Sequence, residues 1–579
     1  MVKRRKTDAP RKPINLLEIG GGKHLTLAAK SAVLTDLKAL GYIPQDQACS
    51  ARQITRCRKE AATRSTDFGR LIVHKEFQTT DGPVLFPLQN PLAMLTIALA
   101  EGPRFAGYVR SAIARFGLPS PDAPWSIILY VDEVTCGQPL AVKADGRRKV
   151  QGVYWSIYQL GAQALADDSS WFELAAFRAV TADGFDGSVS HMLDVCLSCF
   201  FAREHNIRHC CRFELLEHGG FMLCLALEML IADIPALVSA IGANGVSAIL
   251  PCFLCRRVLS FKANAELTSL EGFVDLSCTD LALGRPHTNA SLTKLLRGLE
   301  EAKATLGTTE LKRKITLCGY KPIPNNFLMN AHQVSRPIDI IHPDWMHLMF
   351  QTGNWNRETF QIMRAATTRQ TDAYALLTEY VANFSFPAAR KLRRNTLSPK
   401  HWDSCKDATV FKTSASDGLT LYAVVGKFCQ DVLLPRFAGA KLAELTLMMT
   451  SYNCLSDVVD LLQLSLHGLE IDPDLLDQKC QAWRRAHEAA YGVALTYLKT
   501  HLTSHLAKVL RARMVNRERQ LAMLFACFAL DYSICNAYMM CIYDSAWARC
   551  FSNARARRTC TSIYMPCTRS ATTNTSADM

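Results

Sequence analysis

The chain has 579 residues, enough for about three or four domains of roughly 150 residues each. Apolar residues make up 49% of it and charged residues 20%, which excludes wholesale disorder, collagen-like repeats and a small disulfide-held scaffold. The 66 Lys and Arg residues outnumber the 52 Asp and Glu residues, giving a net charge of +14. Nucleic acid is the commonest partner of such a chain, although many basic proteins bind no anion.

Residues 1–22 are expected to form a basic, disordered tail that ends in three glycines. The basic cluster formed by Lys3–Lys6, Arg11 and Lys12 is similar to a nuclear-import signal, and is equally typical of a solvated tail. No apolar segment follows it, so it is not a secretory signal. We therefore predict a nuclear protein, in a reducing compartment.

Two further features bear on the compartment. Cysteines within apolar runs, such as Cys196, Cys199 and Cys224, are expected to be buried thiols rather than disulfides. The apolar stretches 234–255 and 521–543 are interrupted by Pro, Gly, Asn or Asp, so we predict protein core there and no membrane contact.

The order of the expected elements predicts an α/β core. Residues 23–119 have mostly helical spacing of their apolar positions. Strands are then expected at 125–134, 150–160 and 171–180, a helix over 188–204 and a fourth strand at 221–232. Three consecutive strands, a helix and another strand form a meander followed by a crossover.

The rest of the chain is predicted to be helical at its core and irregular at its edges. Residues 256–330 are expected to form an irregular, partly helical insertion into a core that spans 120–360. A helical C-terminal region follows over 361–548, and residues 549–579, rich in Ser, Thr and Arg, are expected to be disordered.

Three aspartates stand at the boundaries of these elements. Asp132 closes the first strand, Asp233 closes the fourth, and Asp344 opens a helix. Carboxylates at the ends of neighbouring strands meet at one edge of a sheet, where their repulsion favours a bound cation such as Mg²⁺ or Mn²⁺. Two such ions could activate a nucleophile and stabilise the leaving oxygen of a phosphodiester. Acids at strand ends are also common turn formers, so the spacing alone leaves both interpretations open.

A CxxC pair, Cys252 and Cys255, follows the second aspartate. Such a pair can supply half of a zinc site, or it can be two buried thiols. No second CxxC follows at the spacing of a zinc finger, so other ligands would come from distant residues. His347 is the first candidate, and His287, His332 and His342 are the others.

The motifs DEVTCGQPL at 132–140, ADIPAL at 232–237 followed by GANG and PCFLC, and PDWMH at 343–347 occur in this order. Over about 120–360 the chain thereby resembles the DDE/D transposases of the CACTA (En/Spm-like) and Plavaka-like group. The resemblance implies an RNase H-like mixed-sheet core between helical N- and C-terminal regions.

The same resemblance implies a reaction and a ligand set. Asp132, Asp233 and Asp344 would hold two divalent metal ions, Mg²⁺ or Mn²⁺, while Cys252, Cys255 and His347 would form a zinc or structural site. The implied activity is metal-dependent cleavage of DNA strands at transposon ends and their transfer to target DNA. Double-stranded DNA and further copies of the chain are the implied partners.

Two positions and two functions remain open at this stage. Glu133 adjoins Asp132, and we prefer Asp132 because strand alternation sends neighbouring side chains to opposite faces. Glu358 is the alternative third acid to Asp344. The first alternative function is a catalytically inactive, transposase-derived DNA-binding or scaffold protein. The second is a helical interaction protein, which the absence of a mixed sheet would favour.

Overall fold

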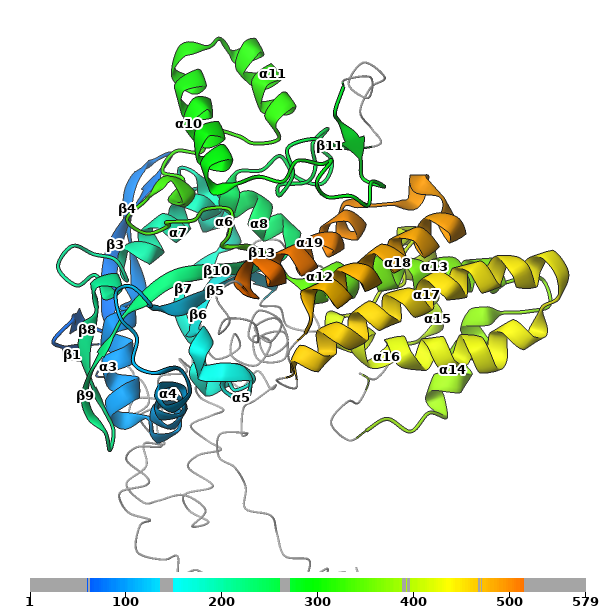
Figure 1. Ribbon diagram of the computed structural model, residues 1–579, viewed down its shortest axis with the longest axis horizontal. Coiled ribbons are helices and arrows are strands. Elements are labelled where there is room, and N and C mark those ends of the chain that lie inside the picture. The colour runs from blue at the N-terminus through cyan, green and yellow to red at the C-terminus, as the bar shows by residue number, and fades with distance from the viewer. Residues whose placement is uncertain are drawn as a thin grey trace, which may run out of the picture.

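The computed structural model (Figure 1) places a mixed sheet in one half of the molecule and a group of long helices in the other. It describes residues 60, 63–135, 149–260, 271–387, 392, 396–466, 469 and 471–514. The expected tails at 1–22 and 549–579 and the apolar stretch 521–543 lie outside these residues.

Strands, rather than helices, open the described part of the chain. They are β1 (Ser65–Thr66), β2 (Gly69–Arg70), β3 (Ile72–Thr79) and β4 (Gly82–Gln89), and β3 and β4 pair antiparallel. The prediction that 23–119 is mostly helical is therefore wrong for these residues. The reason is local, because Asp81-Gly82 is a hairpin signal between two runs of β-branched and aromatic residues. The helical spacing further on does produce helices, α3 (Pro91–Glu101) and α4 (Pro103–Phe116).

A five-stranded mixed sheet forms the centre of the fold. In spatial order its strands are β13 (Ile341–Pro343), β10 (Leu225–Ala232), β5 (Trp125–Thr135), β6 (Lys149–Ile157) and β7 (Phe172–Arg178). β5, β6 and β7 form an antiparallel meander, while β10 and β13 run parallel to β5. The predicted α/β class and the mixed sheet are confirmed.

The central strand is apolar on both of its faces. Ile127, Ile128, Leu129 and Val131 of β5 are each 0% exposed. A continuous apolar run is typical of a strand that is covered on both sides, since no position has to face water. The short helices α5 (Gly161–Leu165) and α6 (Ala179–Asp183) and the longer α7 (Ser188–Ser198) follow the meander strands.

The expected fourth strand is divided in two. Its first half is β9 (Gly219–Leu223), which pairs with β8 (Cys211–Leu215) in a separate hairpin, and only its second half is β10. Between them Cys224 forms a disulfide with Cys210, so the expectation of a free thiol at Cys224 is wrong. Cys196 and Cys199 are buried free thiols, as expected.

The chain between the second and third aspartates contains α8 (Ile234–Ile241), β11 (Val258–Leu259), β12 (Val274–Asp275), α10 (Asn289–Thr305) and α11 (Thr308–Cys318). This agrees with the expected irregular, partly helical insertion. In Figure 1, α10 and α11 project together from the body of the molecule. No residue of α11 is buried.

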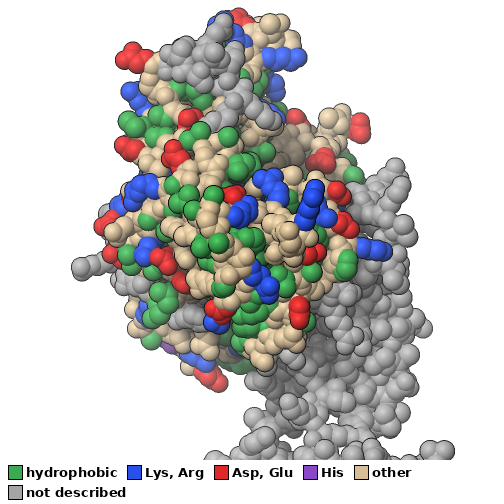
Figure 2. Space-filling view, turned by 90° about the vertical axis from the view of Figure 1, so that its right-hand side faces the viewer, with side chains coloured by type: hydrophobic (Ala, Val, Ile, Leu, Met, Phe, Trp, Pro, Cys, Tyr) green, Lys and Arg blue, Asp and Glu red, His purple; other side chains and the backbone are tan. Residues whose placement is uncertain are grey.

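From residue 345 to residue 514 the described chain is mostly helical, so the helical region expected over 361–548 is seen as far as residue 514, and 515–548 lie outside the described residues. Its helices are α12 (Trp345–Met349), α13 (Asn354–Ala366), α14 (Ala373–Ala382), α15 (Pro399–Ala408), α16 (Ala415–Phe428), α17 (Gly439–Leu466), α18 (Pro473–Tyr491) and α19 (Leu498–Met514). Among the helices of the described residues, none is long and apolar enough to cross a membrane. Over the face shown in Figure 2, acidic and basic side chains are interspersed with apolar ones.

Candidate carboxylate site and metal centre

The three predicted aspartates lie at the ends of three neighbouring parallel strands. Asp132 is near the end of β5, and Asp233 and Asp344 directly follow β10 and β13. Ala232 of β10 is paired with Val131 of β5 on one side and with Pro343 of β13 on the other. Asp132, Asp233 and Asp344 are the next residues of their respective strands, and the backbone N–H of Asp344 donates to Ala232 O at 3.0 Å. Adjacent strands lie about 4.8 Å apart. The fold therefore places the three residues side by side at one edge of the sheet.

Strand alternation decides between Asp132 and Glu133. Tyr130 and Asp132 lie two residues apart on β5 and so project from the same face. The hydroxyl of Tyr130 donates to Asp344 Oδ2 at 3.3 Å, so this face carries Asp344 as well. Glu133 projects from the opposite face, where it forms an ion pair with Lys149. These contacts favour Asp132 as the member of the site.

A tyrosine ring covers the glycine that is paired with Asp132. Gly152 of β6 is the cross-strand partner of Asp132, and a Cβ at Gly152 would lie 2.5 Å from the ring of Tyr154. That separation is far below a van der Waals contact, so any side chain at this position would push the ring away. The ring of Tyr154 therefore lies over Gly152, on the strand next to Asp132.

We expect Gly152→Val to lower the free energy of unfolding by about 1–3 kcal/mol, because it overpacks the sheet next to Tyr154. The control is Gly298→Ala in α10, where a Cβ would meet no atom within 4 Å and the helix gains about 0.5–1 kcal/mol. Urea unfolding followed by circular dichroism measures both changes. Equal stability of the two variants would contradict the close contact.

Asp233 and Asp344 also cap the helices that follow them. Asp233 Oδ1 accepts from the N–H of Ala236 at 2.8 Å at the start of α8. Asp344 Oδ1 accepts from the N–H of Met346 at 2.8 Å at the start of α12, and its side chain is 1% exposed. Capping fixes both carboxylates at the sheet edge, because the cap occupies one oxygen of each and holds its rotamer.

His347 contacts Asp344 and lies in the electric field of Asp233 and Asp132. Its Nδ1 lies 2.9 Å from Asp344 Oδ2. Burial by itself lowers the pKa of His347, but the charge and the hydrogen bond of Asp344 outweigh it and raise the pKa to about 9. The charges of Asp233 and Asp132 contribute to the same increase. The imidazole therefore lies within electrostatic reach of every carboxylate at this edge.

Lys499 of α19 approaches the same edge from the helical half. Its ammonium group donates to His347 O at 2.9 Å and to Gln351 O at 2.5 Å. Burial and the positive charge of Arg357 lower the pKa of Lys499 to about 8, against the opposing charges of Asp233 and Asp344. No pattern in the sequence pointed to this residue, because it lies 155 positions after Asp344 in an unremarkable helix.

The CxxC pair meets two histidines of α19. Cys252 Sγ lies 3.7 Å from His505 Nε2, and Cys255 Sγ lies 3.3 Å from the same atom and 3.6 Å from His501 Nε2. The two Nε2 atoms are 3.3 Å apart. Zn–S bonds of about 2.3 Å and Zn–N bonds of about 2.0–2.1 Å at tetrahedral angles require S–N separations of about 3.5 Å and an N–N separation of about 3.3 Å. The observed distances fit a tetrahedral zinc ion.

The protonation of the four side chains also suits a metal. Burial lowers the pKa of His505, which leaves its imidazole neutral. Burial raises the pKa of Cys252, but a hydrogen bond from Cys255 and the two histidines bring it well below its ordinary value. The pKa of Cys255 is raised in turn by sharing that hydrogen bond and by burial. A bound dication would hold both sulfurs as thiolates.

The Cys₂His₂ cluster corrects the expected ligand set. Cys252 and Cys255 are members, as predicted, but His501 and His505 complete the set in place of His347, which contacts Asp344 instead. The other candidates, His287, His332 and His342, are not members either. Within the described part of the chain, this is the one group of at least three His, Cys, Asp or Glu residues whose ligand atoms all lie within 4.8 Å of one another.

The alternative third acid, Glu358, belongs to the interior of the helical half. It is 0% exposed, and its Oε1 accepts from Trp483 Nε1 at 2.7 Å and from Ser451 Oγ at 2.9 Å. His487 Nδ1 lies 3.0 Å from the same oxygen. Glu358 therefore joins α13 to α17 and α18, and these partners give it a structural role.

We expect Glu358→Ala to lower the free energy of unfolding by about 3–5 kcal/mol, because it leaves the groups around the buried carboxylate without their partner. Thermal unfolding measures the loss. Glu379→Ala, at an exposed position of α14, is the control and is expected to change stability by less than about 0.5 kcal/mol. Equal melting temperatures for the two variants would show that the network contributes nothing.

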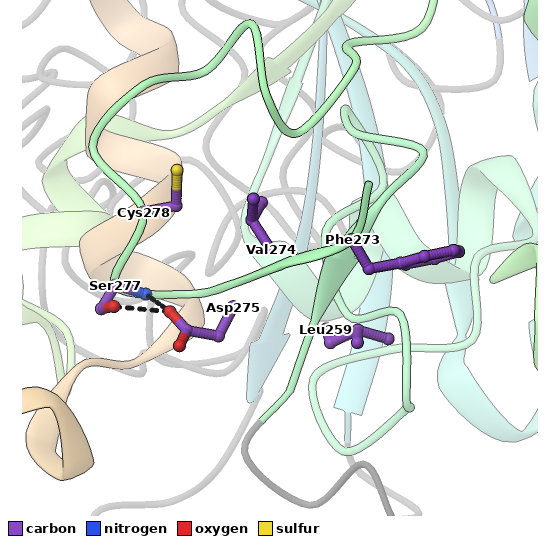
Figure 3. Close-up of a pocket in the computed structure, with 6 residues that line it drawn as sticks. All are labelled: Leu259, Phe273, Val274, Asp275, Ser277 and Cys278. Carbon is purple, nitrogen blue, oxygen red and sulfur yellow. Dashed lines mark hydrogen bonds between the residues drawn. The ribbon is translucent and has the colours of Figure 1, made fainter. Parts of the chain in front are cut away.

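A pocket within the insertion carries no second site. It is lined by Leu259, Phe273, Val274, Asp275, Ser277 and Cys278 (Figure 3). Asp275 Oδ1 accepts from both the N–H and the hydroxyl of Ser277, at 2.7 Å and 2.5 Å. The acid of the pocket is thus satisfied by its own turn rather than directed at a ligand.

Comparison with known proteins adds no family to this geometry. No protein-family model matches the sequence, and no curated protein matches it either.

Proposed function

We propose that this chain is a transposase-like enzyme that cleaves DNA strands and transfers them to target DNA at a divalent-metal site formed by Asp132, Asp233 and Asp344. The observation that carries the proposal is the shared register of the three residues on β5, β10 and β13. An antiparallel meander extended by two parallel strands is also the arrangement that an RNase H-like core requires, and the sheet order supports it.

Mg²⁺ or Mn²⁺ would bind to the aspartate oxygens and supply the activation of a nucleophile and the stabilisation of the leaving oxygen. The chain's own groups would orient the site. Capping holds Asp233 and Asp344 in place, and the positive charge of His347 balances the cluster when no metal is bound. Two ions about 4 Å apart separate their ligands, so the three carboxylates need not lie within 4.8 Å of one another.

The composition of the N-terminal region fits a nucleic-acid partner. Residues 1–59 contain 13 Lys and Arg residues but only four Asp and Glu residues. Phosphate contacts from such residues supply non-specific DNA affinity. We propose accordingly that double-stranded DNA is the substrate, that the protein acts in the nucleus, and that it assembles as a homo-oligomer, since two DNA ends must be handled together.

The test is a nicking assay on supercoiled plasmid with the full-length protein, supplied with zinc. Nicked and linear products are expected with Mg²⁺ or Mn²⁺ and are expected to be absent with Ca²⁺ alone. Cleavage that does not depend on the added metal, or no cleavage with any of them while DNA is bound, would contradict the enzymatic proposal.

A second function is favoured by one observation. Asp344 is nearly fully buried, its Oδ1 caps α12, and its Oδ2 accepts from Tyr130 and contacts His347. A carboxylate held in this way can serve as a purely structural cap. The corresponding proposal is a transposase-derived protein that binds DNA without cutting it, and DNA binding with no cleavage in the same assay would support it. The mixed sheet disfavours the alternative of a helical interaction protein.

A further inference from the structure

Among the residues that the structure describes, Arg357 has no anionic partner. It lies close to the aspartate edge, the end of the sheet that carries Asp132, Asp233 and Asp344. Its guanidinium carbon is 3.6 Å from the centroid of the Tyr497 ring. Its side chain is only partly exposed, and its Nε is buried without a hydrogen-bond partner. It takes part in none of the ion pairs of the described residues. Burying a cation costs solvation free energy, and a bound anion offsets that cost.

Lys499 places a second positive charge next to the first. It follows Tyr497 by two residues, and its ammonium group donates to His347 O, on the residue that contacts Asp344. Arg357 and Lys499 are near enough for their charges to repel each other. Two cations held together against repulsion, beside the edge where metal would sit, form an electropositive position suited to an anion.

Hydrogen bonds between α13 and α19 fix this pair before any ligand arrives. Thr500 Oγ1 donates to Asn354 Oδ1 at 3.0 Å, and Asn354 Nδ2 lies 3.0 Å from Thr503 Oγ1. Arg357 is one turn after Asn354 on α13, and Lys499 adjoins Thr500 on α19. The two cations are therefore carried by elements that are locked to each other, so little ordering is required on binding.

We propose that Arg357, supported by Lys499, binds a backbone phosphate of the DNA strand that enters the aspartate edge. The proposal rests on the proposed function for the identity of the polyanion. A guanidinium stacked on an aromatic ring keeps its N–H edge available for bidentate contact with phosphate. The two carbonyl bonds of Lys499 leave its third N–H for the same ligand.

The experiment measures the salt dependence of DNA binding by full-length, zinc-loaded protein. The probe is a fluorescein-labelled 30-base-pair duplex of random sequence, and fluorescence anisotropy is followed in Ca²⁺ buffer between 50 and 300 mM KCl. Each phosphate contact contributes about −0.9 to the slope of log K against log[salt]. Arg357→Gln is expected to make the slope shallower by about 0.9.

Arg364→Gln is the matched control, because Arg364 is exposed on the same helix and also lies over an aromatic ring, that of Phe360. It is expected to retain the wild-type slope, and so is Arg357→Lys, which keeps the charge. An unchanged slope in Arg357→Gln would overturn the inference, and so would an equal reduction in Arg357→Lys, since that would point to altered folding rather than lost charge.

This result is independent of cleavage. If Arg357→Gln shows the predicted slope change but the wild-type protein cuts no DNA, the phosphate contact is supported and the proposed enzyme is contradicted. Wild-type protein that cuts DNA, with an unchanged slope in Arg357→Gln, would support the enzyme and remove Arg357 from it.

Discussion

Replacing Cys252 and Cys255 together by serine is expected to abolish zinc binding and to lower the thermal stability of the chain by several degrees. Both sulfurs are buried, and with the two Nε2 atoms of His501 and His505 they form a tetrahedral set. A metal that binds only the folded state stabilises it by about 4 kcal/mol at a free concentration 1,000 times its Kd. Metal content is measured by plasma mass spectrometry and stability by calorimetry.

The loss of zinc is also expected to disturb the positions of Asp233 and Asp344 at the end of the sheet. α19 carries both histidine ligands, and Lys499 on the same helix donates to the backbone of His347 in α12 and of Gln351 just after it. Cys252 and Cys255 follow α8, the helix that Asp233 caps. Zinc would thereby join the elements that position Asp233 and Asp344.

Cys454→Ser is the control for the zinc prediction, because Cys454 is a partly exposed thiol of α17 outside the cluster. It is expected to retain zinc and stability. Wild-type protein purified without chelators that contains no zinc, or a double variant as stable as the control, would contradict the metal centre.

Asp132→Asn is expected to reduce metal-dependent DNA cleavage by a factor on the order of 10²–10³ or more while leaving DNA binding intact. The amide keeps the size of the side chain but removes the charge that a divalent ion requires. Losing one preorganised electrostatic contact in an active site commonly has an effect of this size. The rate of plasmid nicking under single-turnover conditions measures the change.

The neighbouring residue supplies the control. Glu133→Gln removes an equal charge from the opposite face of β5, where the side chain pairs with Lys149. Its nicking rate is expected to stay within about twofold of wild type, because an exposed ion pair contributes little. Equal losses in Asp132→Asn and Glu133→Gln would show that charge near the sheet edge, rather than a specific ligand, is what matters.

Asp233→Asn extends the test to the second strand. Asparagine caps a helix about as well as aspartate, so α8 and the stability of the chain should be preserved. The nicking rate should nevertheless fall as far as in Asp132→Asn. A fully active Asp233→Asn would restrict Asp233 to its role as a cap.

Local patterns in the sequence predicted two of the three strands that carry the aspartates, but not β13, because a strand of three residues is too short to show a pattern. The apolar runs that became β5 and β10 end at Asp132 and Asp233, and a run of this kind predicts both the strand and the place where its last side chain emerges. The mixed order of the strands followed from the connection rules for a meander and a crossover. The strands at 65–89 were missed because the helical spacing of apolar residues before and after them, at 25–37 and 92–100, dominated the interpretation of that region.

The metal centre could be predicted only in part. The CxxC spacing identifies Cys252 and Cys255, but their partners lie almost 250 residues further along the chain, and the sequence does not show which helix returns to them. His501 and His505 are spaced i, i+4 on α19, which places them on one face. That pattern is present in HLTSHL, but it could be recognised as a ligand pair only once α19 was known to pack beside the insertion.

Locating a divalent metal ion at the aspartate edge would test the proposed active site directly. Crystals of the zinc-loaded protein grown with MnCl₂ would be measured for anomalous scattering above the manganese absorption edge. Manganese peaks are expected in contact with the carboxylates of Asp132, Asp233 and Asp344. Ordered electron density for all three side chains with no manganese between them, at millimolar Mn²⁺, would contradict the proposed active site.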